Sequence, residues 1–275
     1  MKSVLAALGT ALILCQGSAA ADEAQAWYCD AQAIRWTKTE LGDQKAVVAL
    51  PKEGETIERL VVFLHGDAAR RDPTYQYKSA DFIAKNWPGT VAVGMLRPSY
   101  KDGCGKGSDG ADSFKMGDNY TPQVVASLAA SIRALKDEFN PKQTIIMGHS
   151  GGSALTGLLA ARYGALQDMS VMISCPCDLP KWRQMMAKLT ENPRWKNDMP
   201  GLSATAEVGT IPVGADVRLF VGANDRVTPP FLSEEFVAAA KARGMEFPLT
   251  IVPDASHDFI VEQRQLKAVL DAIRD

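Results

Sequence analysis

The sequence has few histidines, no large surplus of charge and little that would span a membrane. It holds 3 histidines in 275 residues, and its formal net charge is −2. A protein that binds a phosphate backbone usually carries a basic surplus, so we expect no nucleic-acid partner. The sequence also lacks a His-Glu-x-x-His pattern, an acidic calcium loop and a Walker sequence. We therefore predict no metal and no cofactor.

One apolar run stands at the N-terminus. After a lysine at position 2, residues 4–14 are mostly apolar and residues 18–21 are small. This order is typical of a secretory signal peptide that ends in an Ala-x-Ala cleavage site. The run is shorter than the ~20 apolar residues that cross a bilayer, which disfavours a membrane anchor. Leu14 before Cys15 disfavours a lipoprotein signal. We expect residues 1–21 to be a signal peptide, and the protein to be exported, periplasmic or secreted, with no membrane span.

Export would change how the cysteines are interpreted. Four of the five cysteines lie after the expected signal peptide, and an even number in an oxidising compartment favours disulfides. Of the three possible pairings, we expect Cys29–Cys104 with Cys175–Cys177. A redox or metal site at the Cys-Pro-Cys sequence is the alternative. Thioredoxin-like motifs, however, place two residues between the cysteines, and no second ligand pair is visible.

The remaining chain alternates apolar strands with helical patterns. The expected strands are Lys45–Leu50, Arg59–Leu64, Thr90–Leu96, Thr144–Gly148, Met169–Ser174, Val217–Val221 and Leu249–Val252. The expected helices are Ala80–Asn86, Pro122–Phe139, Ser153–Tyr163, Pro230–Arg243 and Val261–Ile273. This alternation predicts an α/β fold with a mostly parallel central sheet and helices on both faces. The strands before Leu64 lack helices between them and are expected to be antiparallel at one edge.

Residues 178–215 interrupt this rhythm. The segment is longer than an ordinary connection and includes Trp182. A long insertion in a compact domain is often functional, so one interpretation is a short cap over a binding cleft. The other is a helix packed on the core, and both stay open.

The segment that carries the chemistry runs from Thr144 to Tyr163. An apolar strand leads directly into Gly-His-Ser-Gly-Gly at positions 148–152, and a helix follows at once. In this strand–turn–helix context the Gly-x-Ser-x-Gly pattern places a serine on a sharp turn with its oxygen exposed. The helix N-terminus favours negative charge nearby. Ser150 is therefore the predicted nucleophile.

With this motif the sequence resembles the α/β-hydrolase superfamily over about residues 45–275. Within the superfamily it looks most like bacterial dienelactone-hydrolase-like and prolyl-oligopeptidase-like serine hydrolases. The resemblance implies one catalytic domain, here residues 22–275 with a possible cap at 178–215. It also implies a triad in the chain order serine, acid, histidine.

That order identifies candidates for the other two residues. Only His257 follows Ser150, and it lies between the last expected strand and the last expected helix, the family's position for the base. Asp225 lies in the loop after the next-to-last strand, where the family places the acid. A purely structural turn is the alternative role for Asp225. Asp254 is a second candidate for the acid, whereas Asp258 is too close behind His257 to orient its ring.

The resemblance also predicts an oxyanion hole. A His-Gly-x turn follows the buried strand Arg59–Leu64, and two N–H donors are needed for a tetrahedral intermediate. We expect them from Gly151 and Asp67. Many relatives have glycine where Asp67 stands, and its carboxylate must turn away from the oxyanion; Ala68 is the alternative donor. His65 is expected to be structural.

Other polar and aromatic residues are expected beside the cleft, at the carboxyl ends of the strands. The candidates for substrate contact are Arg97, Tyr100, Asp118, Asn119, Tyr120 and Trp182. A solvated loop held by Cys104 is an equally good interpretation of the segment that follows Arg97.

The predicted function is that of an exported serine hydrolase that cleaves an ester through an acyl-enzyme. Its substrate is expected to be a small molecule or a peptide. A peptidase or amidase with the same triad stays open, because these motifs do not specify the leaving group. A binding protein on an inactive scaffold is disfavoured, because Ser150, Asp225 and His257 are all present.

The signal peptide leads to the first prediction. We expect cleavage after Ala21 or Ala20, because the small residues end there and polarity begins at Asp22. Intact-mass spectrometry of the mature protein should give a chain that starts at Asp22 or Ala21. A mature chain that retains Met1 would contradict export and weaken the expectation of disulfides.

Overall fold

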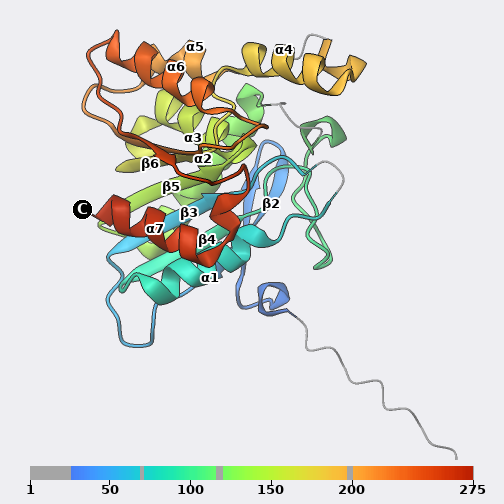
Figure 1. Cartoon of the computed structure of the whole chain (residues 1–275). Helices are drawn as coiled ribbons and strands as arrows, with labels where there is room; N and C mark the ends of the chain where they lie inside the picture. Colours follow the sequence, from blue (N-terminus) through green and yellow to red (C-terminus); the bar gives the residue numbers. More distant parts are fainter. Residues whose placement is uncertain (1–25, 69–70, 116–119, 197–200, 275) are drawn as a thin grey trace, which may run out of the picture.

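An eight-stranded sheet forms the centre of the molecule. The computed structural model describes residues 26–68, 71–115, 120–196 and 201–274 (Figure 1). The sheet order is β1-β2-β4-β3-β5-β6-β7-β8. Strands β3 to β8 pair in parallel, whereas β1–β2 and β2–β4 pair antiparallel at one edge. The predicted mostly parallel α/β architecture is confirmed.

The strands and main helices have these bounds. The strands are β1 Ile34–Thr39, β2 Gly42–Ala49, β3 Arg59–Leu64, β4 Thr90–Met95, β5 Gln143–His149, β6 Met169–Ile173, β7 Asp216–Gly222 and β8 Leu249–Val252. The helices are α1 Tyr75–Asn86, α2 Pro122–Phe139, α3 Gly151–Arg162, α4 Leu179–Thr190, α5 Ala204–Glu207, α6 Pro230–Lys241 and α7 Gln263–Arg274. The 3₁₀ turn η4 spans Pro193–Lys196.

Strand β3 shows why helices cover both faces of the sheet. Its side chains alternate, so that Leu60, Val62 and Leu64 pack with α2 and α3. Val61 and Phe63 pack with α1 and α7 on the other face. All five side chains are fully buried, because parallel strands are covered on both sides. Figure 1 shows α1 and α7 together on one side of the sheet.

Two features of the sheet differ from the sequence-based expectation. Strand β1 was not predicted, because its exposed edge position gives a weak apolar pattern in which Trp36 is 43% exposed. Strand β3 is central and parallel to both neighbours, although the strands up to Leu64 were expected at the antiparallel edge. Helix α1 lies between β3 and β4 and begins earlier than predicted, at Tyr75. A strand–helix–strand unit therefore starts at β3 and not after it.

The described residues between 178 and 215 include α4, η4, α5 and the 3₁₀ turn η5 Val208–Thr210. Helix α4 begins after Asp178, whose Oδ1 accepts the N–H of Lys181 at 3.0 Å. Leu179 and Trp182 belong to the same apolar cluster as α2 and α3. This part of the chain therefore packs on the core at its first turn. Among the described residues, no helix is both long and apolar enough to cross a bilayer. The expected signal peptide lies outside the described residues.

Both cysteine pairs lie at disulfide-bonding distance. The Cα atoms of Cys29 and Cys104 are 5.1 Å apart, and those of Cys175 and Cys177 are 5.0 Å apart. These are the two pairs expected from the sequence. The first ties the N-terminal segment to the loop after β4, next to the buried ion pair of Lys45 with Asp102.

The two bridges should differ in their effect on stability. The Cys29–Cys104 bridge closes a loop with a separation of 75 residues, whereas the other separation is 2. Replacing Cys29 and Cys104 by serine should lower the free energy of unfolding by roughly 2–4 kcal/mol, the range typical of disulfides that close long loops. The matched Cys175→Ser/Cys177→Ser variant should lose much less; urea unfolding measures both. Four titratable thiols in the unreduced, denatured protein would contradict the pairing.

Candidate active site

Ser150 stands on a sharp turn between β5 and α3. Its backbone has φ 55° and ψ −123°, a conformation that residues other than glycine rarely adopt. Glycines make this turn possible, because a side chain at Gly148 would collide with the backbone of Gly152. A side chain at Gly152 would collide with the carbonyl oxygens of Leu64 and His65, at the end of β3. The motif thus holds Ser150 against the neighbouring strand.

Ser150, His257 and Asp225 lie in one hydrogen-bonded line. The Nε2 atom of His257 is 3.0 Å from Oγ of Ser150. The Nδ1 atom of His257 is 2.9 Å from Oδ2 of Asp225. All three residues follow carboxyl ends of parallel strands, those of β5, β7 and β8, so the sheet brings distant parts of the sequence together.

Asp225 is both a turn residue and the partner of His257. Its Oδ1 accepts the N–H groups of Val227 and Thr228 at 2.9 and 2.8 Å. Its Oδ2 accepts the hydroxyl of Thr228 at 2.8 Å. Burial opposes its negative charge, but the hydrogen bonds from His257 and Thr228 prevail, and the pKa of Asp225 lies below its ordinary value. The capped turn and the hydrogen bond with His257 therefore coexist in one carboxylate.

Thr228 was not predicted as a site residue. The Asp-x-x-Thr spacing of a side-chain-capped turn is the sequence signal that points to it. Of the other acids considered, Asp258 has a side chain that is 71% exposed and lies 3.8 Å from His149. Asp254 has a left-handed backbone after β8. Asp225 is the one within hydrogen-bond distance of His257 Nδ1.

The turn after β3 lies directly beside Ser150. A side chain at Gly66 would meet Cβ of Ser150 at 2.9 Å. The N–H of Gly66 donates to the Tyr75 hydroxyl at 2.6 Å, and that of Ala68 donates to the Tyr100 hydroxyl at 3.3 Å. Ala68 is therefore already engaged, which disfavours it as the second oxyanion donor. The N–H of Gly151, the first in α3, has no acceptor within its helix.

His149 links this turn to the loop that carries His257. Tyr75 accepts the Gly66 N–H and is 2.9 Å from His149 Nδ1, so its hydroxyl donates to that nitrogen. His149 Nε2–H then donates to the carbonyl of His257 at 3.0 Å. The chain of bonds assigns His149 a neutral tautomer with its proton on Nε2. Tyr75 was not predicted as a site residue, because only the packing of α1 brings its hydroxyl to Gly66 and His149.

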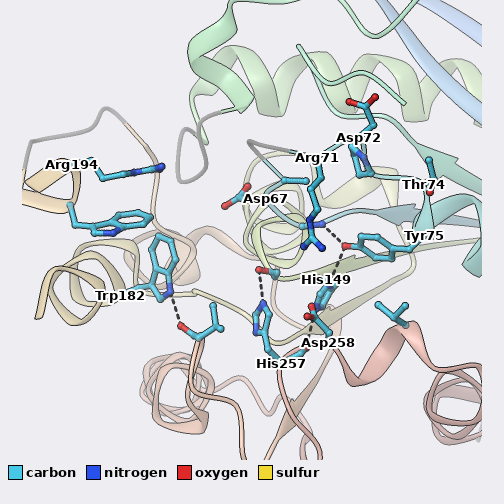
Figure 2. Close-up of a pocket in the computed structure, with 17 residues that line it drawn as sticks. Asp67, Arg71, Asp72, Thr74, Tyr75, His149, Trp182, Arg194, His257 and Asp258 are labelled. Atoms are coloured by element: carbon cyan, nitrogen blue, oxygen red, sulfur yellow. Dashed lines mark hydrogen bonds and ion pairs between the residues drawn. The ribbon is translucent and has the colours of Figure 1, made fainter. Parts of the chain in front are cut away.

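A cleft of about 680 Å³ opens above Ser150. In Figure 2, Trp182 and Arg194 stand on one side of it and Asp67, Arg71 and Tyr75 on the other, with His257 between them. Trp182 packs edge-on against Trp195 with ring centroids 5.0 Å apart. Its Nε1–H donates to the carbonyl of Val227 at 2.8 Å, in the loop that follows Asp225. The segment 178–215 therefore forms one wall of the cleft as well as packing on the core.

Three residues expected to touch substrate lie elsewhere. Arg97, Tyr100 and Tyr120 are 1%, 2% and 0% exposed and do not line the cleft. They are buried behind the turn after β3, because Arg97 follows β4 and points beneath that turn. The prediction that these three side chains contact the substrate is therefore wrong. Trp182 does line the cleft. Asp118 and Asn119 lie outside the described residues.

Two further histidine features concern structure and metals. His65 is fully buried, with Nδ1 2.7 Å from the Gly66 carbonyl and Nε2 accepting the Arg97 N–H at 3.1 Å, as expected of a structural residue. Within the described residues, His149, His257 and Asp258 offer ligand atoms within 4.8 Å of one another. The bonds to Ser150, Asp225, Tyr75 and the His257 carbonyl already engage both histidine rings. A metal ion would have to displace some of them.

Protonation of His149 should cost stability. Burial lowers the pKa of His149 to about 4, and the nearby His257 lowers it in the same direction. The pKa of a histidine in the unfolded chain is about 6.5. At a pH between about 6.5 and about 4, His149 therefore carries a proton in the unfolded chain but not in the folded chain. The free energy of unfolding should therefore fall on acidification, by on the order of 1–2 kcal/mol between pH 7 and 5 from this residue.

Urea unfolding of the His149→Gln variant measures this contribution. Glutamine keeps a donor for the His257 carbonyl but does not titrate, so the variant should lose less stability than the native protein between pH 7 and 5. Ser174→Ala is the control, because it removes another donor to that carbonyl without removing a titrating group. Equal pH slopes for His149→Gln and the native protein would contradict the assignment.

Solved structures share this architecture. The acylaminoacyl peptidase of Pyrococcus horikoshii is similar with a TM-score of 0.68 and 14% identity, covering 88% of this chain and 41% of that chain. Est1E from Butyrivibrio proteoclasticus gives a TM-score of 0.63 and 15% identity, covering 88% and 100%. A ferulic-acid complex of Est1E gives 0.64 and 16%, covering 91% and 100%. The Pyrococcus furiosus esterase Pf2001 gives 0.64 and 17%, covering 87% and 89%. These likenesses show the fold, and the chain spans about two fifths of the peptidase.

The sequence itself matches one family. Comparison with curated proteins finds no significant match. Residues 98–274, well over half of the chain, match the family described as the prolyl oligopeptidase family. That range includes Ser150, Asp225 and His257. The expected resemblance is thereby confirmed: the protein is a serine hydrolase with the α/β-hydrolase fold, and it belongs to the prolyl oligopeptidase family.

Proposed function

We propose that the protein cleaves carboxylic esters with Ser150 as nucleophile, His257 as base and Asp225 as the acid that orients the base. The observation that carries the proposal is the line of hydrogen bonds at 3.0 and 2.9 Å through the His257 ring. A nucleophile within reach of a base, itself oriented by a third group, is the arrangement that covalent catalysis needs.

Acylation follows from this geometry. His257 Nε2 takes the proton of Ser150 as Oγ attacks the ester carbonyl, and Asp225 stabilises the imidazolium that forms. The N–H groups of Gly151 and Asp67 are proposed to hold the oxyanion. The imidazolium returns its proton to the departing alkoxide. Water activated by the same histidine then releases the acid from Ser150.

Esterases are among the solved structures that share this fold, namely Est1E and the Pf2001 esterase. An acidic pocket for a substrate amine would favour a peptidase. The carboxylate of Asp67 lies in the cleft, but it binds the guanidinium of Arg97 and the hydroxyl of Tyr120. A peptidase or amidase stays the second candidate, because the family and several neighbours are peptidases.

The tryptophan wall supports a substrate with an apolar or aromatic group. Trp182 is anchored to Val227 and packed against Trp195, so its ring forms a firm surface beside Ser150. Aromatic rings favour such partners through burial and edge or offset contacts. The ferulic acid bound to Est1E is a ligand of this kind in a protein of the same fold.

We also propose that the protein acts outside the cytoplasm after loss of residues 1–21. The order of basic, apolar and small residues at the N-terminus supports export. The two cysteine pairs at bonding distance support an oxidising compartment.

The triad should behave as one unit. Ser150→Ala and His257→Ala should each lower kcat on short-chain activated esters by on the order of 10⁴–10⁶-fold. Their double variant should be little worse than either, because each loss already disables the same step. Asp225→Asn should cost somewhat less, since the histidine keeps its place but loses its best orienting partner. A fluorophosphonate probe should label the native protein and spare Ser150→Ala.

Matched substrates separate the two candidate activities. An ester and an amide with the same aromatic acyl group should be cleaved at very different rates, with the ester favoured. Preferential cleavage of the amide or of peptides would support the second candidate. Equal labelling and ester hydrolysis by Ser150→Ala and the native protein would overturn the nucleophile assignment and with it the proposed function.

A further inference from the structure

Asp67 creates an electrostatic problem at the proposed oxyanion hole. It stands in the turn after β3, one of the two positions from which the oxyanion is proposed to be held. Its carboxylate also occupies the space where a side chain at Gly151 would begin, beside the other proposed donor. A negative charge there opposes the negative charge that develops on the substrate oxygen.

Two buried groups meet this carboxylate. Nη1 of Arg97 donates to Oδ1 of Asp67 at 2.9 Å, and the hydroxyl of Tyr120 donates to Oδ2 at 2.8 Å. The side chain of Arg97 is 1% exposed and that of Asp67 is 19% exposed. Each carboxylate oxygen thus accepts a hydrogen bond from a buried group behind the turn, and the charge of Arg97 offsets that of Asp67.

Arg97 also holds the backbone of the same turn. Its N–H donates to Nε2 of His65 at 3.1 Å, and its Nη1 donates to the His65 carbonyl at 3.1 Å. The guanidinium lies 5.3 Å from the ring centre of Tyr100 and 5.8 Å from that of Tyr120. Tyr100 in turn accepts the N–H of Ala68. Arg97 therefore contacts His65 and Asp67 directly. It reaches Ala68, on the other side of the proposed donor, through Tyr100.

Arg97 keeps its positive charge although it is buried. Burial opposes it, but the surrounding oxygens of Tyr100, Asp67 and Tyr120 prevail and raise the pKa of Arg97 above its ordinary value. Burial, reinforced by Asp67, raises the pKa of Tyr120 well above its ordinary value, so its hydroxyl stays a donor. Arg97 and Tyr120 therefore both keep the protons that they donate to Asp67.

We propose that Arg97 is a positioning residue for ester cleavage: it turns the Asp67 carboxylate away from the reacting oxygen, neutralises it, and fixes the Asp67 N–H as an oxyanion donor. The inference rests on the proposed function. It explains how an aspartate can occupy a position beside the oxyanion without opposing catalysis. It also replaces the direct substrate contact that the sequence suggested for Arg97.

A charge-specific mutant cycle tests the proposal. Arg97→Met removes the cation that binds Asp67, so kcat for a short-chain ester should fall on the order of 10²–10³-fold with little change in KM. The rate of fluorophosphonate labelling should fall in parallel. Adding Asp67→Asn to Arg97→Met removes the charge and should restore kcat by about tenfold or more. A merely structural role for Arg97 would give no such recovery.

A second variant keeps the charge and changes only the geometry. Arg97→Lys retains a cation near Asp67 but loses the planar group that reaches both Asp67 and the His65 carbonyl. Its kcat should fall less than that of Arg97→Met, and adding Asp67→Asn should give no recovery, because the charge is already balanced. This pair keeps the test decisive if Arg97→Met does not fold.

The buried ion pair of Lys45 with Asp102 supplies a matched control. Both side chains are 0% exposed, their N···O distance is 2.9 Å, and they do not line the cleft. Lys45→Met should lower stability as Arg97→Met does, yet change kcat by no more than about threefold where both are folded.

The outcomes separate the inference from the proposed function. If the fluorophosphonate probe did not label the native protein and the protein cleaved no short-chain ester, the proposed function itself would be refuted. An active native protein whose folded Arg97 variants keep their kcat would overturn the inference alone. So would an equal loss of kcat in Lys45→Met, or failure of Asp67→Asn to improve a folded Arg97→Met variant.

Discussion

The close approach of the turn between β5 and α3 to the end of β3 is the constraint on which the site depends. Gly152 packs where any side chain would meet the carbonyls of Leu64 and His65, and Gly66 packs in the same way against Ser150. Backbone contact of this kind leaves no freedom to shift one turn without the other, since interiors are close-packed. Ser150 and the turn with Asp67 are consequently one rigid unit built on adjacent parallel strands, with Leu64 paired to Gly148.

The histidine loop belongs to a different part of the sheet, and buried hydrogen bonds bring it into register. The link runs from Gly66 through Tyr75 and His149 to the carbonyl of His257, while Asp225 and Thr228 hold the ring from the other side. Every donor in the link from Gly66 meets an acceptor, which is the condition for a buried polar network to stabilise a unique arrangement. Neutral His149 and charged Asp225 thus serve one purpose, the orientation of His257.

Much of this could be predicted from the sequence, for identifiable reasons. Buried parallel strands have continuous apolar runs, so β3, β4 and β5 were found, and the motif at Ser150 needs glycines at fixed positions. With three histidines, the triad order that the resemblance implies led to His257. Strand β1 was not predicted, because a strand at an exposed edge does not need a continuous apolar pattern. Arg97, Tyr100 and Tyr120 were placed in the cleft because their sequence position is right for it. Only tertiary packing determines that these side chains turn inward beneath the His65–Asp67 turn.

The position of β8 bears on how the protein loses activity. β8 has four residues, lies at the edge of the sheet, and includes Ile251 at 42% exposure, whereas β3 is fully covered at the centre. Strands with one neighbour and few buried contacts open at a lower free-energy cost than the centre of a sheet. His257 follows this strand, whereas Ser150 follows β5, the neighbour of β3 near the centre of the sheet. We therefore expect fraying of this single edge to separate His257 from Ser150 while the rest of the sheet stays folded, so that activity is lost on heating before the fold is lost.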